Sequence, residues 1–530
     1  MDLSPIVYKL EVSMSAHSFW QYAQLNPKKL ALVAPDARSW TRGQLLAECN
    51  RVAHGLRQLG LRKGDVVAAA LPNCAEYVAL ALAATQTGLL LVPINWHLAG
   101  EEVAYILRDS EAKAFISHES VTEAASAAVQ AAGFPSSAAF SLGDIAGFRP
   151  YCELVRNQST DNPVDRAIGT VMFYTSGTTG KPKGVRRAIP EVDPDTAASR
   201  QTLLLQLFGI GPEQDNVHFC GSPIYHTAVL NWVTNSLHFG HTVVMQNKWD
   251  AQAMLELVDR HQVTTAHLVP TQFVRLLKLP DDVRQRYNVS SMRHLLHTAA
   301  PCSPDIKQAM IDWFGPCIYE YYAATEGGGT LCNSEDWLQN PGTVGRAWPG
   351  ADVRILDDHG NDVPAGEVGT VYMKMSDVSR FEYKGDKAKT EKDRVGDYFT
   401  AGDVGYLNER GFLFLCDRKI DMIISGGANI YPAEIENVLI THPQVADCCV
   451  FGIPNDEWGE EIKAVVQPVP GVSGSSVLTE DILAFCSKTL AKMKLPKSID
   501  YVELLPRDPN GKLYKRQLRA PYWQNQTRHI

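Results

Sequence analysis

The sequence predicts an α/β fold, on three observations. Strand-like and helix-like runs alternate in the first part of the chain, short β runs follow after about Gly342, and helices and strands mix again after Cys416. With 530 residues, the chain exceeds one ordinary hydrophobic core. We therefore expect a large N-terminal domain over 1–416, made of α/β subdomains and a β-rich subdomain, and a small α+β C-terminal domain over 417–530.

The first α/β run begins with a helix over 41–59, where apolar residues recur at helical spacing and Gly60 provides a stop signal. A short apolar run over 65–71 predicts a strand, a helix is expected over 75–86, and a second strand over 89–94. This order favours parallel pairing, because two parallel strands need a crossover connection between them.

The same alternation recurs further along the chain. We expect a strand over 243–245, a helix over 251–262, a strand over 264–270, a strand over 294–300, a helix over 303–314 and a strand over 317–322. Short β runs follow over 352–360, 369–375 and 411–418, separated by Gly or Asp turns. These runs are the basis for the β-rich subdomain.

A glycine-rich loop, FYTSGTTGKPKG over 173–184, follows the apolar run 167–174, which we expect to be a buried strand. Glycines let the backbone approach a ligand closely, and the hydroxyl and lysine side chains beside them suit a polyphosphate. The loop is not a Walker P-loop, because Pro182 follows Lys181 and opposes a helix start there. The alternative is a surface linker rich in Gly, Ser and Thr, and the loop alone leaves both open.

Four more motifs accompany this loop: YYAATE (321–326), TAGDVGYLNERG (400–411), DRKIDMIISGGANIYPAEIE (417–436) and PNGKLYKRQL (509–518). Together the five resemble, in the same order and over nearly the whole chain, the adenylate-forming superfamily of acyl-CoA synthetases, peptide-synthetase adenylation domains and firefly-type luciferases. The chain is most similar to a fatty-acid or other carboxylic acid:CoA ligase. The resemblance implies ATP and CoA as co-substrates, Mg²⁺ as cofactor, and a mobile C-terminal domain that rotates about a hinge at Asp417 between two half-reactions.

The resemblance also implies which residues bind ATP. Glu326 would hold Mg²⁺, for which a carboxylate oxygen is a suitable ligand, and Thr325 beside it would contact the α-phosphate. Tyr322 would stack on adenine, while Asp403 and Arg418 would reach the ribose. The full expected set is the phosphate-loop residues Thr175, Ser176, Gly177, Thr178, Thr179, Gly180 and Lys183, the adenine-wall residues Ala299, Ala300 and Pro301, and Tyr322, Thr325, Asp403, Arg418 and Lys512.

The expected catalytic residues are Lys512, Glu326 and Thr175. By resemblance, Lys512 serves only the first half-reaction, in which a carboxylate attacks the α-phosphorus of ATP; a lysine there offsets the repulsion between two anions. Without the shared motifs, Lys512 would be taken for a solvated turn lysine, Asp403 for a turn aspartate and Arg418 for a surface charge.

The acyl and CoA sites are also implied by the resemblance. His226, Trp232 and Gly327 fall in regions that line the acyl site, although a lone histidine is as often a packed core residue. These regions are mostly apolar or small, which disfavours an amino acid and leaves fatty, alicyclic and aromatic acids open. Gly426 and Gly427 would let the pantetheine arm of CoA pass; a glycine turn ahead of the next helix is an equal explanation, and both can hold.

The sequence departs from the family pattern in three places. After Gly184 it has VRRA where many relatives have a histidine, and Arg186 and Arg187 there could be a basic rim for phosphates or ordinary surface charges. Ala323 stands where a glycine is usual after the tyrosine, and Ala401 where a threonine is usual. The alanine at 323 requires that the backbone there avoid glycine-only angles. None of these changes touches Glu326, Asp403 or Lys512, so we expect an active enzyme.

The composition of the chain argues against several other functions and locations. The formal net charge is −9 and no long basic run is present, which argues against nucleic-acid binding. The N-terminus lacks a signal-peptide pattern, and the apolar stretch from Tyr77 is interrupted by Thr-Gln-Thr-Gly, so no transmembrane segment is expected. An odd number of cysteines, 11, without a CxxC pair favours a reducing cytoplasm. The oligomeric state stays open, a homodimer included.

Three functions compete at this stage. The first is an acyl-CoA synthetase, and the second a stand-alone adenylating enzyme that loads an acyl group onto a carrier protein. The third is a nucleotide-dependent scaffold without turnover, against which intact Glu326 and Lys512 argue; a luciferase-type oxygenase is a weaker fourth.

Overall fold

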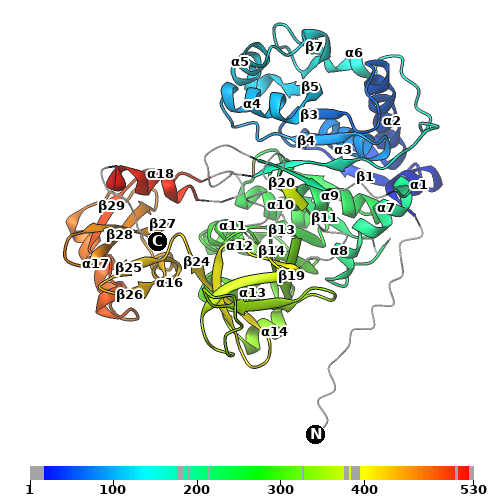
Figure 1. Ribbon diagram of the computed structural model, residues 1–530. Helices are drawn as coiled ribbons and strands as arrows, with labels where there is room; N and C mark the ends of the chain where they lie inside the picture. The colour runs from blue at the N-terminus through cyan, green and yellow to red at the C-terminus, as the bar shows by residue number, and fades with distance from the viewer. Residues whose placement is uncertain are drawn as a thin grey trace. The chain divides into compact units, whose positions relative to one another are not determined.

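The computed structural model describes residues 17–175, 183–187, 191–212, 215–324, 327–374, 381–383, 394–507, 511 and 513–524. They form two compact units: unit 1 takes the described residues of Met1–His267 and Phe381–Asp386, and unit 2 those of Leu268–Arg380 and Lys387–Ile530. The predicted α/β class is confirmed, because several mixed and parallel sheets carry helices on their faces (Figure 1). The expected domain boundary between 416 and 417 lies inside unit 2 and stays a prediction.

Unit 1 contains a six-stranded parallel sheet in the order β7-β6-β5-β3-β4-β8. Its strands are β3 (Val66–Ala70), β4 (Leu90–Pro93), β5 (Ala112–His118), β6 (Ala139–Leu142), β7 (Arg149–Pro150) and β8 (Thr170–Val171), and its helices α2 (Arg42–Gln58), α3 (Ala75–Gln86), α4 (Gly100–Ser110), α5 (Thr122–Ala132) and α6 (Tyr151–Val155). Figure 1 shows α4 and α5 to one side of these strands and α2 to the other. All five residues of β3 are buried, as expected for a strand covered on both faces.

The helix predicted over 41–59 is confirmed as α2. Its N-cap Thr41 accepts a hydrogen bond from the Gln44 backbone N–H at 3.2 Å, and the Gln44 side chain accepts one from the Thr41 N–H at 2.8 Å. This reciprocal capping satisfies two backbone donors at the helix start.

A second group of strands in unit 1 has the order β13-β11-β12-β1-β2, parallel except for the last pair. Its elements are β1 (Leu30–Val33), β2 (Ser39–Thr41), β11 (Val217–Cys220), β12 (Thr242–Met245), β13 (Thr265–Leu268), α1 (Phe19–Leu25), α7 (Pro194–Gln201), α8 (Leu203–Gln206), α9 (Thr227–His238) and α10 (Ala251–His261). The strands and the helix expected over 243–270 are thereby confirmed.

The run 167–174, predicted as one buried strand, is divided between two sheets. β8 extends the parallel sheet beside β4, whereas β9 (Phe173–Thr175) pairs antiparallel with β10 (Lys183–Arg187), and β10 in turn pairs with β20 (Phe381–Tyr383). The prediction of a single strand was wrong, because the backbone changes partners at Met172, whose N–H is the last to bond to Leu91 of β4.

Unit 2 begins with strands in the order β17-β16-β15-β14. The elements are α11 (Pro270–Leu277), α12 (Asp281–Arg286), β14 (His294–His297), α13 (Pro304–Phe314), β15 (Ile318–Ala324), β16 (Gly327–Cys332), α14 (Ser334–Gln339) and β17 (Arg346–Ala347). β14 and β15 are parallel, and β15 and β16 antiparallel. The strand predicted over 294–300 ends at His297, because Ala299 adopts a left-handed conformation with φ of 75° that no strand can contain.

The β-rich part of unit 2 is confirmed as an antiparallel sheet in the order β21-β22-β19-β23-β24, with β18 paired to β19. Its strands are β18 (Val353–Leu356), β19 (Gly369–Lys374), β21 (Arg394–Val395), β22 (Tyr398–Phe399), β23 (Asp403–Leu407) and β24 (Leu413–Arg418). The expected α+β part follows: β25 (Ile423–Ser425), β26 (Ala428–Ile430), α16 (Pro432–Leu439), β27 (Val445–Asn455), β28 (Gly459–Pro468), α17 (Ser476–Cys486), β29 (Ser498–Tyr501) and α18 (Lys515–Arg519).

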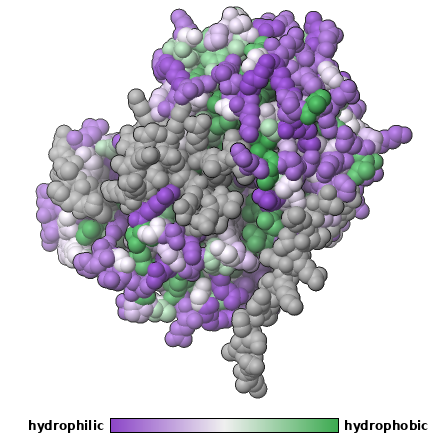
Figure 2. Space-filling model, turned by 45° about the vertical axis from the view of Figure 1, so that its right-hand side comes forward, coloured by the Kyte–Doolittle hydropathy of each residue, from purple (hydrophilic) through white to green (hydrophobic). Residues whose placement is uncertain are grey.

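Apolar side chains make up most of the buried residues. On the face drawn in Figure 2, hydrophilic residues cover most of the described surface. Among the described residues, no helix is both long enough and apolar enough to span a bilayer. All 11 cysteines lie in the described part of the chain, and their thiols are free.

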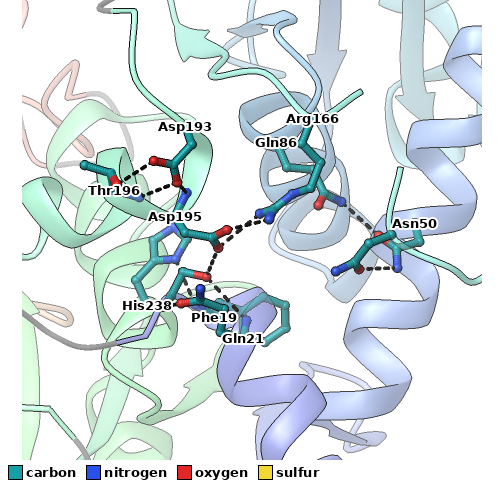
Figure 3. A network of polar contacts seen from close by, with 11 residues as sticks. Phe19, Gln21, Asn50, Gln86, Arg166, Asp193, Asp195, Thr196 and His238 are labelled. Atoms are coloured by element: carbon teal, nitrogen blue, oxygen red, sulfur yellow. Dashed lines mark hydrogen bonds and ion pairs between the residues drawn. The ribbon is translucent and has the colours of Figure 1, made fainter. Parts of the chain in front are cut away.

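A polar network ties four segments of unit 1 together (Figure 3). The Arg166 guanidinium binds the Asp195 carboxylate through two contacts of 2.5 and 3.1 Å, and lies 4.8 Å from the Trp20 ring. His238, at the end of α9, accepts a hydrogen bond from the Phe19 N–H at 3.2 Å, and burial lowers its pKa to about 4. The network therefore fixes α1 and α7 against the end of α9.

We predict that Arg166→Met lowers the free energy of unfolding by about 2 kcal/mol, because it leaves the Asp195 carboxylate without its counterion. Both side chains are about one-fifth exposed, so the loss is smaller than for a fully buried pair. Urea unfolding at pH 7 measures the change. Arg260→Met, which breaks an exposed pair with Glu256, is the matched control and should cost less than about 0.5 kcal/mol. Equal losses in the two variants would contradict this account.

Candidate functional site

The expected phosphate loop connects the two strands of a hairpin. In the register of β9 and β10, Thr175 lies opposite Lys183. Residues 176–182 lie outside the described residues, as do the side chains of Thr175 and Lys183, so the phosphate contacts expected of Ser176, Gly177, Thr178, Thr179 and Gly180 stay predictions. The described residues on either side of this loop pair antiparallel, as β9 and β10.

Tyr322, Asp403 and Arg418 come together in unit 2. The Tyr322 hydroxyl donates to Asp403 Oδ2 at 2.5 Å, and Arg418 Nε lies 3.3 Å from Asp403 Oδ1. Asp403 and Arg418 are register partners in β23 and β24, whereas Tyr322 comes from β15. Burial and the neighbouring carboxylate raise the pKa of Tyr322, so its hydroxyl stays protonated and remains a donor.

The Asp403 carboxylate keeps acceptor capacity in this arrangement. Its two oxygens offer about four lone-pair sites in total, and the two contacts above use only part of them. Its side chain is partly exposed. The carboxylate can therefore also accept hydrogen bonds from a diol such as ribose.

The expected adenine wall directly follows β14. Ala299 and Pro301 are exposed and Ala300 is half-buried, so this segment is open to a ligand. Ala299 has a φ of 75°, which for a non-glycine residue costs on the order of 1–3 kcal/mol. The segment is tied to β15 by Thr298, whose hydroxyl donates to the Tyr321 carbonyl at 2.6 Å. Backbone strain of this kind concentrates at ligand-binding sites.

Asp417 lies beside this group but faces the C-terminal part of unit 2. Its carboxylate accepts hydrogen bonds from the Arg418 N–H at 2.7 Å and from the Ala433 N–H, in the first turn of α16, at 2.9 Å. Burial raises the pKa of Asp417 to about 6. The structure thus gives Asp417 a helix-capping contact, and its role as a hinge stays a prediction.

Gly426 and Gly427 form the turn between β25 and β26. Both have positive φ, 58° and 80°, as a two-residue type I′ hairpin requires. A Cβ on Gly426 would lie 2.5 Å from the Trp458 ring, whereas a Cβ on Gly427 would meet nothing. The glycine turn is therefore present, and a passage for pantetheine beside it stays a prediction.

Thr325, Glu326 and Lys512 lie outside the described residues, so their expected roles stay predictions. The neighbours of Lys512 are described. Arg507 binds Asp447 through two contacts of 2.6 and 2.8 Å and donates a third hydrogen bond, from Nη1 to the Gly511 carbonyl, at 2.6 Å. Sequence reasoning missed Arg507; its place in the PRDPNGK motif was the available signal.

The residues expected to line the acyl site differ in how deeply they are buried. His226 is half-buried and occupies the N-cap position of α9. Trp232 is fully buried, and its ring lies roughly parallel to the rings of His218 and His267, at centroid distances of 6.0 and 6.1 Å. The side-chain surroundings of Gly327 lie outside what is described. All three acyl-site assignments stay predictions.

Close packing explains two of the glycines that follow the YYAATE motif. A Cβ at Gly329 would lie 2.5 Å from both the Trp348 ring and the Tyr322 carbonyl, and one at Gly328 would lie 2.8 Å from Met373. The backbone at Ala323 has no positive φ, so the alanine is accommodated there. These two glycines are therefore required by close packing, independently of any space for a long acyl chain.

A cleft of about 440 Å³ in unit 1 holds none of the expected site residues. It opens where β3 and β5 end, between Arg38, Glu76 and Trp96. The Arg38 guanidinium in it is already paired with Asp36 and Glu76. We assign it no part in adenylation. Within the described residues, no group of three His, Cys, Asp or Glu side chains is arranged to hold a metal ion.

Comparison with known proteins agrees with the motifs. Residues 19–381 match the family described as AMP-binding enzyme, and residues 434–512 match the AMP-binding enzyme C-terminal domain. The chain is 34% identical over 522 residues to the long-chain-fatty-acid–CoA ligase FadD13 of Mycobacterium tuberculosis, covering 95% of this chain and 97% of that protein.

Two further similar proteins carry names that include a different acceptor or a different acid. The fatty acid–[acyl-carrier-protein] ligase ScoC of Streptomyces coeruleorubidus is 31% identical over 536 residues, covering 98% of each chain. The structure of o-succinylbenzoate CoA synthetase (MenE) from Bacillus subtilis, in complex with the acyl-adenylate intermediate OSB-AMP, has a TM-score of 0.77 and 27% identity, covering 94% of this chain and 98% of that one.

We predict that Asp417 makes the protein less stable as the pH rises. Its pKa is about 6 in the folded protein and about 4 in the unfolded chain, so the folded state holds an extra proton between these values and loses that advantage as pH rises toward 6. In Asp417→Asn this component is absent. Urea unfolding from pH 5 to 8 should therefore show the variant gaining stability relative to the wild type up to about pH 6 and not beyond. The exposed Asp312→Asn serves as control; a wild-type-to-variant difference that is independent of pH would refute the assignment.

Proposed function

The chain belongs to the AMP-binding enzyme family and is an AMP-forming acid–thiol ligase, and from that premise we propose that it converts a carboxylic acid to its CoA thioester through an acyl-adenylate. In the first half-reaction, a carboxylate oxygen attacks the α-phosphorus of ATP and pyrophosphate leaves. In the second, the thiol sulfur of CoA attacks the acyl carbon, the acyl–phosphate bond breaks and AMP leaves.

The observation that carries the proposal is the convergence of Tyr322, Asp403 and Arg418 in unit 2. An aromatic ring, a carboxylate with acceptor capacity and a guanidinium are the groups that adenine and ribose require, and they come from three separate motifs. The exposed wall Ala299–Pro301 follows the strand that pairs with β15, the strand of Tyr322. In the proposal, Tyr322 and this wall hold the adenine, and Asp403 and Arg418 hold the ribose.

Lys512, Glu326 and the phosphate loop complete the proposed mechanism. Glu326 is the residue that would hold Mg²⁺; the ion, when bound, neutralises phosphate charge. Lys512 would bind the carboxylate and the α-phosphate in the first half-reaction only. After the C-terminal domain rotates about Asp417, Gly426 and Gly427 would face the pantetheine arm.

The proposed substrate is an acid with an apolar body. The acyl regions around His226, Trp232 and Gly327 are mostly apolar or small, and the names of the relatives FadD13 and ScoC include fatty acids. A carrier-protein thiol is the second candidate acceptor, because ScoC, which is named as a carrier-protein ligase, covers 98% of this chain. A cytoplasmic location and a homodimer are further expectations of the proposal.

An assay with a panel of acids tests the function. The protein is incubated with ATP, Mg²⁺ and fatty, alicyclic or aromatic acids, and pyrophosphate and AMP are followed with and without CoA. AMP formation that requires CoA supports the proposal. Exchange of pyrophosphate into ATP without CoA turnover would instead favour carrier loading, and no turnover across the panel would refute adenylation.

We predict that Lys512→Ala lowers the rate of adenylation by about 100-fold or more, because a preorganised positive charge is lost from the transition state. Thioester formation from a supplied acyl-adenylate should fall less than about threefold, since Lys512 is proposed to leave the site in that step. The two half-reactions are measured separately by pyrophosphate release and by CoA-thiol consumption. Equal loss in both steps would contradict the role given to Lys512, and the nearby Lys515→Ala, which breaks the pair with Glu436, is a control for local unfolding.

A further inference from the structure

A buried polar cluster lies where β14 leads into the expected adenine wall. Lys307 Nζ is 2.5 Å from Glu320 Oε2, and His297 Nε2 is 3.5 Å from the same oxygen. The side chains of Lys307 and His297 are 0% exposed and that of Glu320 is 9% exposed. The three residues come from α13, β15 and β14, so the cluster joins the strand before the wall, the helix after it and the strand of Tyr322.

Two aromatic rings pack against the cluster. The Trp337 ring lies 5.2 Å from Lys307 Nζ, and the Phe273 ring packs edge-on against His297 at a centroid distance of 5.1 Å. Burial raises the pKa of the Glu320 carboxyl, and Lys307 opposes that rise. A charged pair in such surroundings costs desolvation, and pairs of this kind can be replaced by apolar residues without loss of stability. Fold stability alone therefore does not account for the cluster.

The position of the cluster in the chain gives the reason for its presence. His297 is the last residue of β14 and immediately precedes Thr298 and the wall. Glu320 pairs with His297 across the two parallel strands and lies two residues before Tyr322, hence on the same face of β15. A shift of β14 against β15 would therefore move the wall relative to the Tyr322 ring.

The wall itself needs such support. Ala299 has a left-handed backbone, which persists only where the surrounding structure holds it. The Thr298–Tyr321 hydrogen bond is one restraint on this segment, and the Lys307–Glu320 ion pair, with Glu320 in register opposite His297, is the second.

We propose that Lys307, Glu320 and His297 are positioning residues for the nucleotide: they fix the Ala299–Pro301 wall at the distance from Tyr322 that an adenine ring requires. The inference rests on the proposed function, because it assumes that adenine binds there. None of the three touches the nucleotide in this account, so their removal weakens adenosine binding and leaves the chemical step nearly unchanged.

The double variant Lys307→Met with Glu320→Met tests the proposal, because it removes both charges together and leaves no uncompensated one. Isothermal titration with a non-hydrolysable ATP analogue, α,β-methylene-ATP, measures binding, and thermal unfolding measures the fold. We expect a thermal midpoint close to the wild-type value, a Kd for the analogue raised about tenfold or more, and kcat at saturating ATP within about threefold of the wild type. The KM for CoA should not change.

A folded double variant with the wild-type Kd would overturn the proposal. If the double variant does not fold, Glu320→Asp decides, because it keeps the charge but shortens the reach to Lys307. This variant should fold and show a raised Kd, and a wild-type Kd in it would equally overturn the proposal. Lys463→Met with Asp500→Met is the matched control: it removes a pair of 2.7 Å between β28 and β29 and should leave the Kd unchanged.

The wild-type protein separates this inference from the proposed function. If the wild type neither binds the analogue nor releases pyrophosphate with any acid, the proposed function fails, whatever the variants do. If the wild type binds and turns over while the double variant binds equally well, only the positioning role fails.

Discussion

The hydrogen bond from the Tyr322 hydroxyl to the Asp403 carboxylate is the interaction on which the candidate site depends. It joins two sheets of unit 2, because Tyr322 belongs to β15 and Asp403 to β23 of the β-rich sheet. The Tyr322 ring and the Asp403 carboxylate are thereby held at a fixed separation. Arg418 holds the other carboxylate oxygen from the adjacent strand, so the acceptor is restrained on both sides.

The buried cluster adds a second restraint on the same strand, β15. Lys307 and His297 hold Glu320, which lies on the same face of the strand as Tyr322. The strand is thus fixed at one position by an ion pair and two residues later by the bond to Asp403. The strained Ala299 wall is placed by the same ion pair through β14. The side chains of the candidate site are thus fixed by polar contacts between elements, and apolar burial holds those elements together.

Local patterns in the sequence were sufficient to predict most of the helices and strands. α3 has the predicted bounds, 75–86, because an apolar run of helical length is followed closely by Gly88, which ends it. α2 agrees to within a residue at each end, because a capping threonine and a terminal glycine mark it. The family motifs predict that Tyr322 and Asp403 belong to one site, and the structure places their side chains in contact.

Contacts between residues that lie far apart in the chain could not be predicted from the sequence. The run 167–174 has no local signal that its first half pairs with β4 and its second half with β10. Lys307 and Glu320 resemble ordinary charges of an amphipathic helix and a strand, and only the acidic residue inside the apolar run CIYEYYAA hinted at a buried pair. Arg507 was missed for the same reason, since its partner Asp447 is distant in sequence.

The most direct test of the central claim is a crystal structure with a non-hydrolysable acyl-adenylate analogue. The account predicts that the adenine lies between the Tyr322 ring and the Ala299–Pro301 wall, with a ribose hydroxyl within hydrogen-bonding distance of Asp403. Adenosine bound elsewhere, with Tyr322 and Asp403 still bonded only to each other, would contradict it.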